Sequence, residues 1–154
     1  MGEPLRIGLV AGEASGDQLG AALIAALRAR RPDVQCFGVA GPRMRAQGCE
    51  AWARADELAV MGLAEVLRHL PRLLGLRARL HARFVAARPH VFVGIDAPEF
   101  NLGLAARLKR SGLRTVQYVS PQVWAWRQGR VRTIGRAVDR ILCLLLYGDR
   151  KSVV

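Results

Sequence analysis

The sequence is poor in cysteine and lacks long apolar runs. Its 154 residues contain only Cys36, Cys49 and Cys143, which are far apart and form no C-x-x-C pair. This usage excludes a disulfide framework and a zinc site of the common kind, and it predicts reduced, mostly buried thiols in a cytosolic protein. No apolar run approaches the ~20 residues needed to cross a bilayer, and we expect no signal peptide. Any membrane contact is therefore expected to be peripheral.

Histidine and lysine are also scarce. The 3 histidines have no metal-binding spacing with Cys, Asp or Glu, so we predict no metal site. Only Lys109 and Lys151 are lysines, yet Lys and Arg number 24 against 12 Asp and Glu, a net charge of +12. This charge predicts an anionic partner, namely nucleic acid, an acidic membrane surface or a phosphorylated substrate, although a GC-rich genome also produces excess arginine. Because no recognised nucleic-acid-binding motif accompanies the charge, we predict no nucleic-acid partner.

Short apolar runs alternate with longer helical patterns, which is typical of βαβ units and a parallel sheet. Strands are expected at the apolar runs Leu5–Ala11, Val34–Val39, His90–Ile95, Arg114–Val119 and Arg140–Leu145, the last of them buried. Helices are expected at Gly16–Arg30, Gly62–Leu70, Pro71–Ala87 and Phe100–Ser111. A loop with a short helix is expected within 41–50, and a loop followed by a helix within Val123–Arg136. The stretch Glu50–Val60 is ambiguous. We predict an α/β fold, a Rossmann-like doubly wound parallel sheet with its ligand site at the carboxyl ends of the strands.

A glycine-rich segment follows the first predicted strand, with the spacing G-x-x-x-G-x-x-x-G from Gly12 to Gly20. Glycines there let the backbone turn sharply and approach a ligand, and the start of the next helix favours anionic groups. The spacing differs from the dinucleotide fingerprint G-x-G-x-x-G, and Ser15 with Gln18 would form a helix-capping box. A ligand-binding loop and a purely structural helix start therefore both stay open. The candidate ligand-binding residues are Gly12, Glu13, Ser15, Gly16 and Asp17.

Asp96 directly follows the apolar run Val91–Ile95, so it is expected at the carboxyl end of a central strand. A carboxylate there faces the ligand crevice and has the chemistry of a general base. Pro98 is well suited to open the next helix, and Asp96 with Glu99 would then form an N-cap and capping box. The two roles do not exclude each other. We expect Asp96 and the glycine-rich segment to open onto the same crevice.

Two tryptophans follow the strand expected at Arg114–Val119. Trp124 and Trp126 are suited to line a site for a sugar or an acyl chain, and Arg127 is suited to meet phosphate. Tryptophans in this position also commonly pack beneath a loop, which is the structural alternative. The candidate substrate-binding residues of this segment are Ser120, Trp124, Trp126 and Arg127, and we expect them at the same crevice as Asp96.

Four arginines fall within a narrow stripe if one helical phase continues through Pro71, namely Arg68, Arg72, Arg79 and Arg83. Leu73, Leu76, Leu80 and Phe84 fall on a neighbouring face. A basic stripe beside an apolar one suits an anionic membrane surface. A solvated face beside a core-facing one has the same pattern, and both interpretations stay open.

Several long motifs in series resemble the lipid-A-disaccharide synthase family. They are LVAGEASGDQLGAALI, FGVAGPRMRAQGCEAW, ELAVMGLAEVL, VFVGIDAPEFNLGL, YVSPQVWAWRQGRV and GRAVDRILCL, in family order over about Leu5 to Leu145. The resemblance implies the N-terminal, acceptor-binding half of a GT-B glycosyltransferase, a fold in which two Rossmann-like halves face a cleft. Asp96 matches the aspartate of the family's G-x-D-A-P motif, proposed as the base that takes the acceptor's hydroxyl proton. Residues 12–17 and 120–127 match regions that border the cleft.

The resemblance also implies a reaction. The sugar of UDP-2,3-diacylglucosamine moves to the 6-hydroxyl of 2,3-diacylglucosamine 1-phosphate, and UDP leaves with inversion, with no metal or other cofactor. Because both substrates carry acyl chains, the implied location is cytoplasmic, peripheral to the inner face of the cytoplasmic membrane. The anionic surface of that membrane would be the partner of the arginine stripe. The chain departs from the family at Gln117, where histidine is common, and at Gln122 and Glu99, where serine and aspartate are common.

The last residues depart further from the family. After about Leu145 the family continues into a Pro-Phe-Glu segment and a donor-binding domain, whereas this chain ends at Val154. We expect residues 1–145 to form an acceptor-side domain and 146–154 to be a foreign tail from truncation or a sequencing artefact. The start of a common sequencing adapter would encode Asp149 to Val154. We expect the chain alone to be inactive, because positioning both reactants supplies up to ~7–11 kcal/mol of catalysis.

Two other functions are compatible with these residues. One is a GT-B half that acts on a soluble acceptor, which would need no binding to anionic vesicles. The other is a non-catalytic lipid- or anion-binding Rossmann-like module. For such a module, changing Asp96 to asparagine would leave the function of the full-length protein intact.

Overall fold

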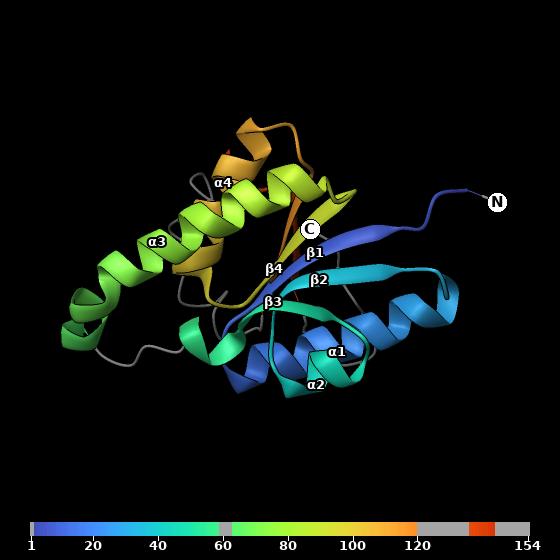
Figure 1. The fold of residues 1–154 in the computed structure, drawn as a ribbon, viewed down its shortest axis with the longest axis horizontal. Helices are drawn as coiled ribbons and strands as arrows, with labels where there is room; N and C mark the ends of the chain where they lie inside the picture. The colour runs from blue at the N-terminus through green and yellow to red at the C-terminus, as the bar shows by residue number, and fades with distance from the viewer. Residues whose placement is uncertain (1, 59–62, 120–135, 144–154) are drawn as a thin grey trace.

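The computed structural model describes residues 2–58, 63–119 and 136–143, without the side chains of 63–67, 119 and 143. Within this part the chain forms one sheet of six parallel strands in the order β3-β2-β1-β4-β5-β6 (Figure 1). The strands are β1 (Arg6–Ala11), β2 (Gln35–Ala40), β3 (Glu50–Arg54), β4 (Val91–Ile95), β5 (Thr115–Val119) and β6 (Arg140–Cys143). This order is that of the doubly wound Rossmann sheet, so the predicted fold class is confirmed.

Helices cover both faces of the sheet (Figure 1). One face carries α1 (Glu13–Arg30) and the short α2 (Pro42–Ala46), where Ile24 and Met44 pack against alternate residues of the strands. The other face carries α3 (Leu63–Ala87) and α4 (Pro98–Arg110), where Phe84 and Leu104 lie in a second apolar cluster. A strand buried on both faces reads as a continuous apolar run, which is why β1 and β4 are visible in the sequence.

Two predicted helix caps are wrong. Helix α1 begins at Glu13, three residues before Gly16, and its N-cap is Gly12, with no side-chain cap bond. Ser15 is therefore an exposed residue of the first turn and forms no capping box. Helix α4 begins at Pro98, which was expected to open it, and its N-cap is Ala97 and not the predicted Asp96.

Three other expectations are corrected. The ambiguous stretch Glu50–Val60 contains β3 and a 3-10 turn, η1 (Ala55–Leu58). The two helices expected on either side of Pro71 are one helix, α3, with Pro71 inside it. The strand expected to be buried at Arg140–Leu145 is described only as β6, whose Arg140 is exposed and whose Ile141 and Leu142 are half-buried. It lies at the end of the strand order, where only one neighbouring strand is described.

The thiol prediction holds where the structure describes the side chains. Cys36 and Cys49 are buried and free, and burial raises the pKa of Cys49 to about 12. The side chain of Cys143 lies outside the described residues. In the described ranges no group of three or more His, Cys, Asp and Glu side chains could hold a metal ion. No described helix is long and apolar enough to span a membrane.

Candidate active site at the switch point of the sheet

Strands β1 and β4 are neighbours, and Ala11 at the end of β1 pairs with Ile95 at the end of β4. The chain leaves β1 toward α1 on one face and leaves β4 toward α4 on the other face (Figure 1). This divergence is the switch point at which doubly wound sheets bind ligands, outside the carboxyl ends of the strands.

Gly12 and the residues after Asp96 meet at this point. A Cβ atom on Gly12 would lie 3.0 Å from the Cβ of Ala97 and 3.3 Å from that of Leu58. Only a glycine lets the three segments approach so closely without displacement. Asp96 and the start of the glycine-rich segment therefore lie at the same edge of the sheet.

Asp96 lies in an unusual backbone turn. Both Asp96 and Ala97 have positive φ angles, 48° and 39°, in the left-handed region that residues with a Cβ rarely adopt. The Asp96 N–H donates to the carbonyl oxygen of Tyr118 on β5 at 2.9 Å. The residue is only 7% exposed, so it is buried at the carboxyl edge of the sheet.

Two buried amides hold the other side of this turn. The Asp96 carbonyl oxygen accepts hydrogen bonds from Asn101 Nδ2 at 2.8 Å and from Gln117 Nε2 at 3.0 Å. Neither residue was predicted for the site. One available signal was Gly94 inside a strand run, since strand glycines often mark close approach of another group.

Tyr118 is a second neighbour that the sequence did not single out. Burial raises the pKa of its phenol, and the negative charge of Asp96 raises the pKa further. The phenol is therefore close enough to Asp96 to feel its charge while remaining protonated near neutral pH.

Asp17 has a structural task within the glycine-rich segment. Its carboxylate accepts the backbone N–H groups of Gly41 at 3.1 Å, Arg43 at 2.9 Å and Met44 at 2.9 Å. Asp17 is 3% exposed, so these three bonds bind the start of α2 to α1. Its predicted contact with substrate gains no support from these bonds. Of the other candidates, Gly12 and Gly16 are buried, while Glu13 and Ser15 are exposed.

A cavity of about 530 Å³ adjoins the glycine turn at the same edge of the sheet. Its lining includes Glu13 and Asp17 of α1, and Arg43 and Arg45 of α2. Arg54 also lines it but forms an ion pair with Asp56. Arg43 and Arg45 form no ion pair within the described part of the chain, so they are the cations available to an anionic ligand.

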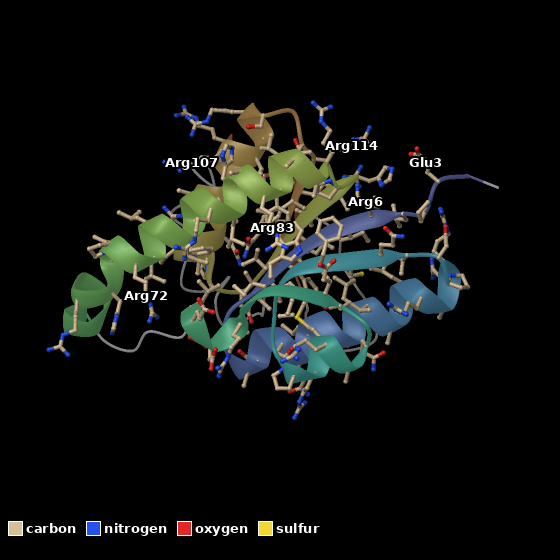
Figure 2. The ribbon with its side chains drawn as sticks, in the orientation of Figure 1. Glu3, Arg6, Arg72, Arg83, Arg107 and Arg114 are labelled. Carbon is tan, nitrogen blue, oxygen red and sulfur yellow. The ribbon has the colours of Figure 1, made fainter. Side chains whose placement is uncertain are left out.

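The predicted arginine stripe lies along one continuous helix. Because α3 runs through Pro71, Arg68, Arg72, Arg79 and Arg83 keep one helical phase, and all four are exposed. Figure 2 shows Arg83 over the sheet, where its guanidinium lies 4.3 Å from the ring centroid of Trp52, and Arg72 farther along the helix. The N-terminal part of α3 extends past the sheet (Figure 1), and its Leu70 and Leu74 are 41% and 49% exposed.

The predictions for Ser120, Trp124, Trp126 and Arg127 lie outside the described residues. Strand β5, after which they follow, ends at Val119 beside β4, with Tyr118 paired to Ile95.

Comparisons with known proteins identify the family. The family described as lipid-A-disaccharide synthetase matches residues 7–149. The chain is 62% identical over 144 residues to the lipid-A-disaccharide synthase of Sodalis glossinidius, covering 94% of this chain and 38% of that protein. It is 60% identical over 146 residues to the enzyme of Yersinia pseudotuberculosis, covering 95% of this chain and 37% of that protein. The chain thus spans less than two fifths of the length of these curated relatives.

A solved structure shares the fold. The crystal structure titled as the glycotransferase of kitacinnamycin superposes with a TM-score of 0.59 at 19% identity, over 84% of this chain and 35% of that one. At this identity the likeness concerns the fold alone. The family match covers most of the sheet and the whole described switch point, from β1 to the turn at Asp96, and on this basis the chain belongs to the lipid-A-disaccharide synthetase family.

Proposed function

We propose that this chain forms the acceptor-side half of an enzyme that makes the lipid A disaccharide. The sugar of UDP-2,3-diacylglucosamine is transferred to the 6-hydroxyl of 2,3-diacylglucosamine 1-phosphate. The observation that supports this most is the buried Asp96, held by its backbone at the switch point of the sheet. A carboxylate in this position is suited to act on a hydroxyl bound at the carboxyl edge.

Asp96 acts in this proposal as the general base. It removes the proton of the 6-hydroxyl as that oxygen attacks the anomeric carbon of the donor sugar. The bond from that carbon to the diphosphate breaks, UDP leaves with the electron pair, and the configuration inverts. The proposed step needs no metal or other cofactor.

The cavity beside the glycine turn is suited to the head group of the acceptor. Arg43 and Arg45 lie in its wall without an ion pair among the described residues, and guanidinium groups bind phosphate through charge-assisted hydrogen bonds. We assign them to the 1-phosphate, with Gly12, Glu13, Ser15 and Gly16 bordering the sugar. Ser120, Trp124, Trp126 and Arg127 are proposed to complete the site.

The location proposed for the enzyme is the cytoplasmic side of the inner membrane, with peripheral attachment. Leu70 and Leu74 are exposed on the part of α3 that extends past the sheet, and Arg68 and Arg72 are exposed on the same part. Exposed apolar side chains beside cations are typical of helices that lie on an anionic bilayer. Arg83 packs on Trp52, so the proposed contact is centred on Arg68 to Leu74.

The test uses a full-length chimaera, hereafter the chimaera. The aligned 144 residues of this chain replace their counterparts in the lipid-A-disaccharide synthase of Klebsiella pneumoniae, which is 62% identical over that length. Disaccharide formation from the two proposed substrates is expected in the chimaera. The change Asp96→Asn is expected to lower kcat about 10²–10⁴-fold, the usual contribution of a general base.

Glu99→Gln is the matched control, because Glu99 is an exposed carboxylate three residues further along the chain. It is expected to retain kcat within a few-fold. Full activity of the Asp96→Asn chimaera would remove the base from the proposal. An inactive but folded chimaera would refute the assigned reaction.

A further inference from the structure

We propose that Asn101 and Gln117 are positioning residues whose buried amides clamp the carbonyl of Asp96 and so aim its carboxylate at the acceptor. The inference rests on the proposed function of Asp96 as the base. It assigns a task in the reaction to two side chains that have no need to touch either substrate.

The turn that the amides hold is conformationally unfavourable. Asp96 and Ala97 both have positive φ, and two successive residues with a Cβ rarely adopt the left-handed region. Such backbone strain persists only where the surroundings over-determine it, and it is concentrated at functional sites. A relaxed turn would rotate the Cα–Cβ bond of Asp96 and move its carboxylate.

Three hydrogen bonds with two neighbouring elements, α4 and β5, hold this turn. The amide of Asn101, on α4, donates to the Asp96 carbonyl at 2.8 Å, and that of Gln117, on β5, donates to the same oxygen at 3.0 Å. The N–H of Asp96 donates to Tyr118 of β5 at 2.9 Å. Both polar groups of the Asp96 backbone are therefore held by hydrogen bonds with neighbouring elements.

The burial of the two amides argues against a role in packing alone. Asn101 is 0% exposed and Gln117 is 1% exposed, and neither Oδ1 of Asn101 nor Oε1 of Gln117 accepts a hydrogen bond from the described residues. Burying such an oxygen without a partner is costly, and an apolar side chain of similar shape would avoid this cost. Unlike leucine or methionine, the two amides donate hydrogen bonds to the Asp96 carbonyl oxygen.

The sheet itself makes room for the clamp. A Cβ on Gly94 would lie 2.6 Å from Oε1 of Gln117 and 2.8 Å from Cβ of Asn101. Both side chains therefore lie over the bare backbone of β4, two residues before Asp96. The absence of a side chain at Gly94 leaves the space that the two amides fill.

The experiment replaces Gln117 in the chimaera and measures kcat and KM separately. Gln117→Met keeps the size and removes the donor, and it is expected to lower kcat 10- to 100-fold while KM for both substrates changes less than threefold. Gln117→His supplies a ring N–H donor and is expected to recover most of the lost kcat. Thr115→Val is the control: it is a buried polar residue on the same face of β5, bonded to Ala137 and Asp139, and its kcat should remain unchanged.

A second measurement links the effect to Asp96. In the Asp96→Asn background, Gln117→Met is expected to cause no further loss of kcat, because residues that act as a unit are not additive. If Gln117→Met keeps full kcat while Asp96→Asn remains defective, the clamp is overturned and the proposed base stands. If the losses of kcat from Asp96→Asn and Gln117→Met multiply in the double variant, the clamp is likewise overturned. An Asp96→Asn chimaera with full kcat would instead overturn the proposed role of Asp96 as the base.

Discussion

The side-chain amide of Asn101 bridges the ends of two neighbouring strands. Its Nδ2 lies 3.2 Å from the carbonyl oxygen of Val10 on β1 and 2.8 Å from that of Asp96 after β4. One buried residue of α4 thus links the ends of the two strands from which the chain turns to opposite faces of the sheet.

The close packing over β4 predicts that Gly94 cannot carry a side chain. Gly94→Ala places a methyl group against Gln117 and Asn101, and overpacking of this kind costs about 1–3 kcal/mol of unfolding free energy. Denaturant unfolding of the chimaera measures it, and kcat should fall as the amides are displaced.

Gly75 of α3 provides the matched control for this substitution. No other group lies within 4 Å of a Cβ built there, so Gly75→Ala is expected to stabilise the helix by about 0.5–1 kcal/mol. Equal effects of the two substitutions would contradict the packing described around Gly94.

The sequence predicts the sheet better than it predicts the turns. Apolar runs identify β1 and β4, and Asp96 is correctly expected at a strand end, because burial on both faces leaves a direct trace in composition. The edge strand β3 was missed since its residues are exposed or half-buried and carry no such trace. Left-handed residues such as Glu13 and Ala97 gave no signal, since neither is a residue type typical of that region.

The partners of Asp96 could not be predicted for a different reason. The contact of Gln117 with Asp96 joins residues 21 positions apart that meet only when β4 and β5 pair. The same holds for Asp17, which was predicted to contact a ligand but bonds to residues 24 to 27 positions away. Local periodicity carries no information on such pairs.

The bonds of Asp17 predict a stability role. In Asp17→Ala the three N–H groups at the start of α2 lose a charged acceptor, and hydrogen bonds to charged groups contribute about 1.5–3 kcal/mol. A fall of at least this size in unfolding free energy is expected. Asp33→Ala, which removes an exposed carboxylate paired with Arg31, should have little effect. The prediction fails if the two variants are equally stable.

Burial of Cys49 predicts a loss of stability in alkali. Burial raises its pKa from 9.0 to about 12 in the folded chain, so the folded state retains a proton that the unfolded state has lost. The contribution of this group is complete below pH 9 and is lost as pH rises toward 12. The unfolding free energy of the chimaera should therefore fall between pH 8 and pH 10.5. The fall should be larger than the fall measured for its Cys49→Ala variant over the same pH range. A pH dependence that is the same in both would exclude the thiol as its source.

The cavity arginines predict a defect in acceptor binding. Arg43→Ala in the chimaera is expected to raise KM for 2,3-diacylglucosamine 1-phosphate about tenfold, which corresponds to about 1.4 kcal/mol, and to leave KM for the UDP-sugar unchanged. Arg45→Ala should act in the same direction. Arg30→Ala removes an exposed arginine from the far end of α1 and is the control. An unchanged acceptor KM after removal of both Arg43 and Arg45 would place the phosphate elsewhere.

The proposed contact of α3 with an anionic membrane can be tested with vesicles. Leu70→Ser with Leu74→Ser should lower partitioning of the chimaera onto phosphatidylglycerol-containing vesicles, because both side chains lie open to solvent. Arg68→Gln with Arg72→Gln should weaken binding by about 1 kcal/mol per charge, on anionic vesicles and at low salt only. Figure 2 shows Arg107 and Arg114 well away from Arg72, so the pair Arg107→Gln and Arg114→Gln removes the same charge from another surface. A local contact through α3 should make the Arg68 and Arg72 changes weaken sedimentation with vesicles more than the Arg107 and Arg114 changes do. If both pairs weaken it equally, attachment depends on the net charge of the protein and not on the α3 surface.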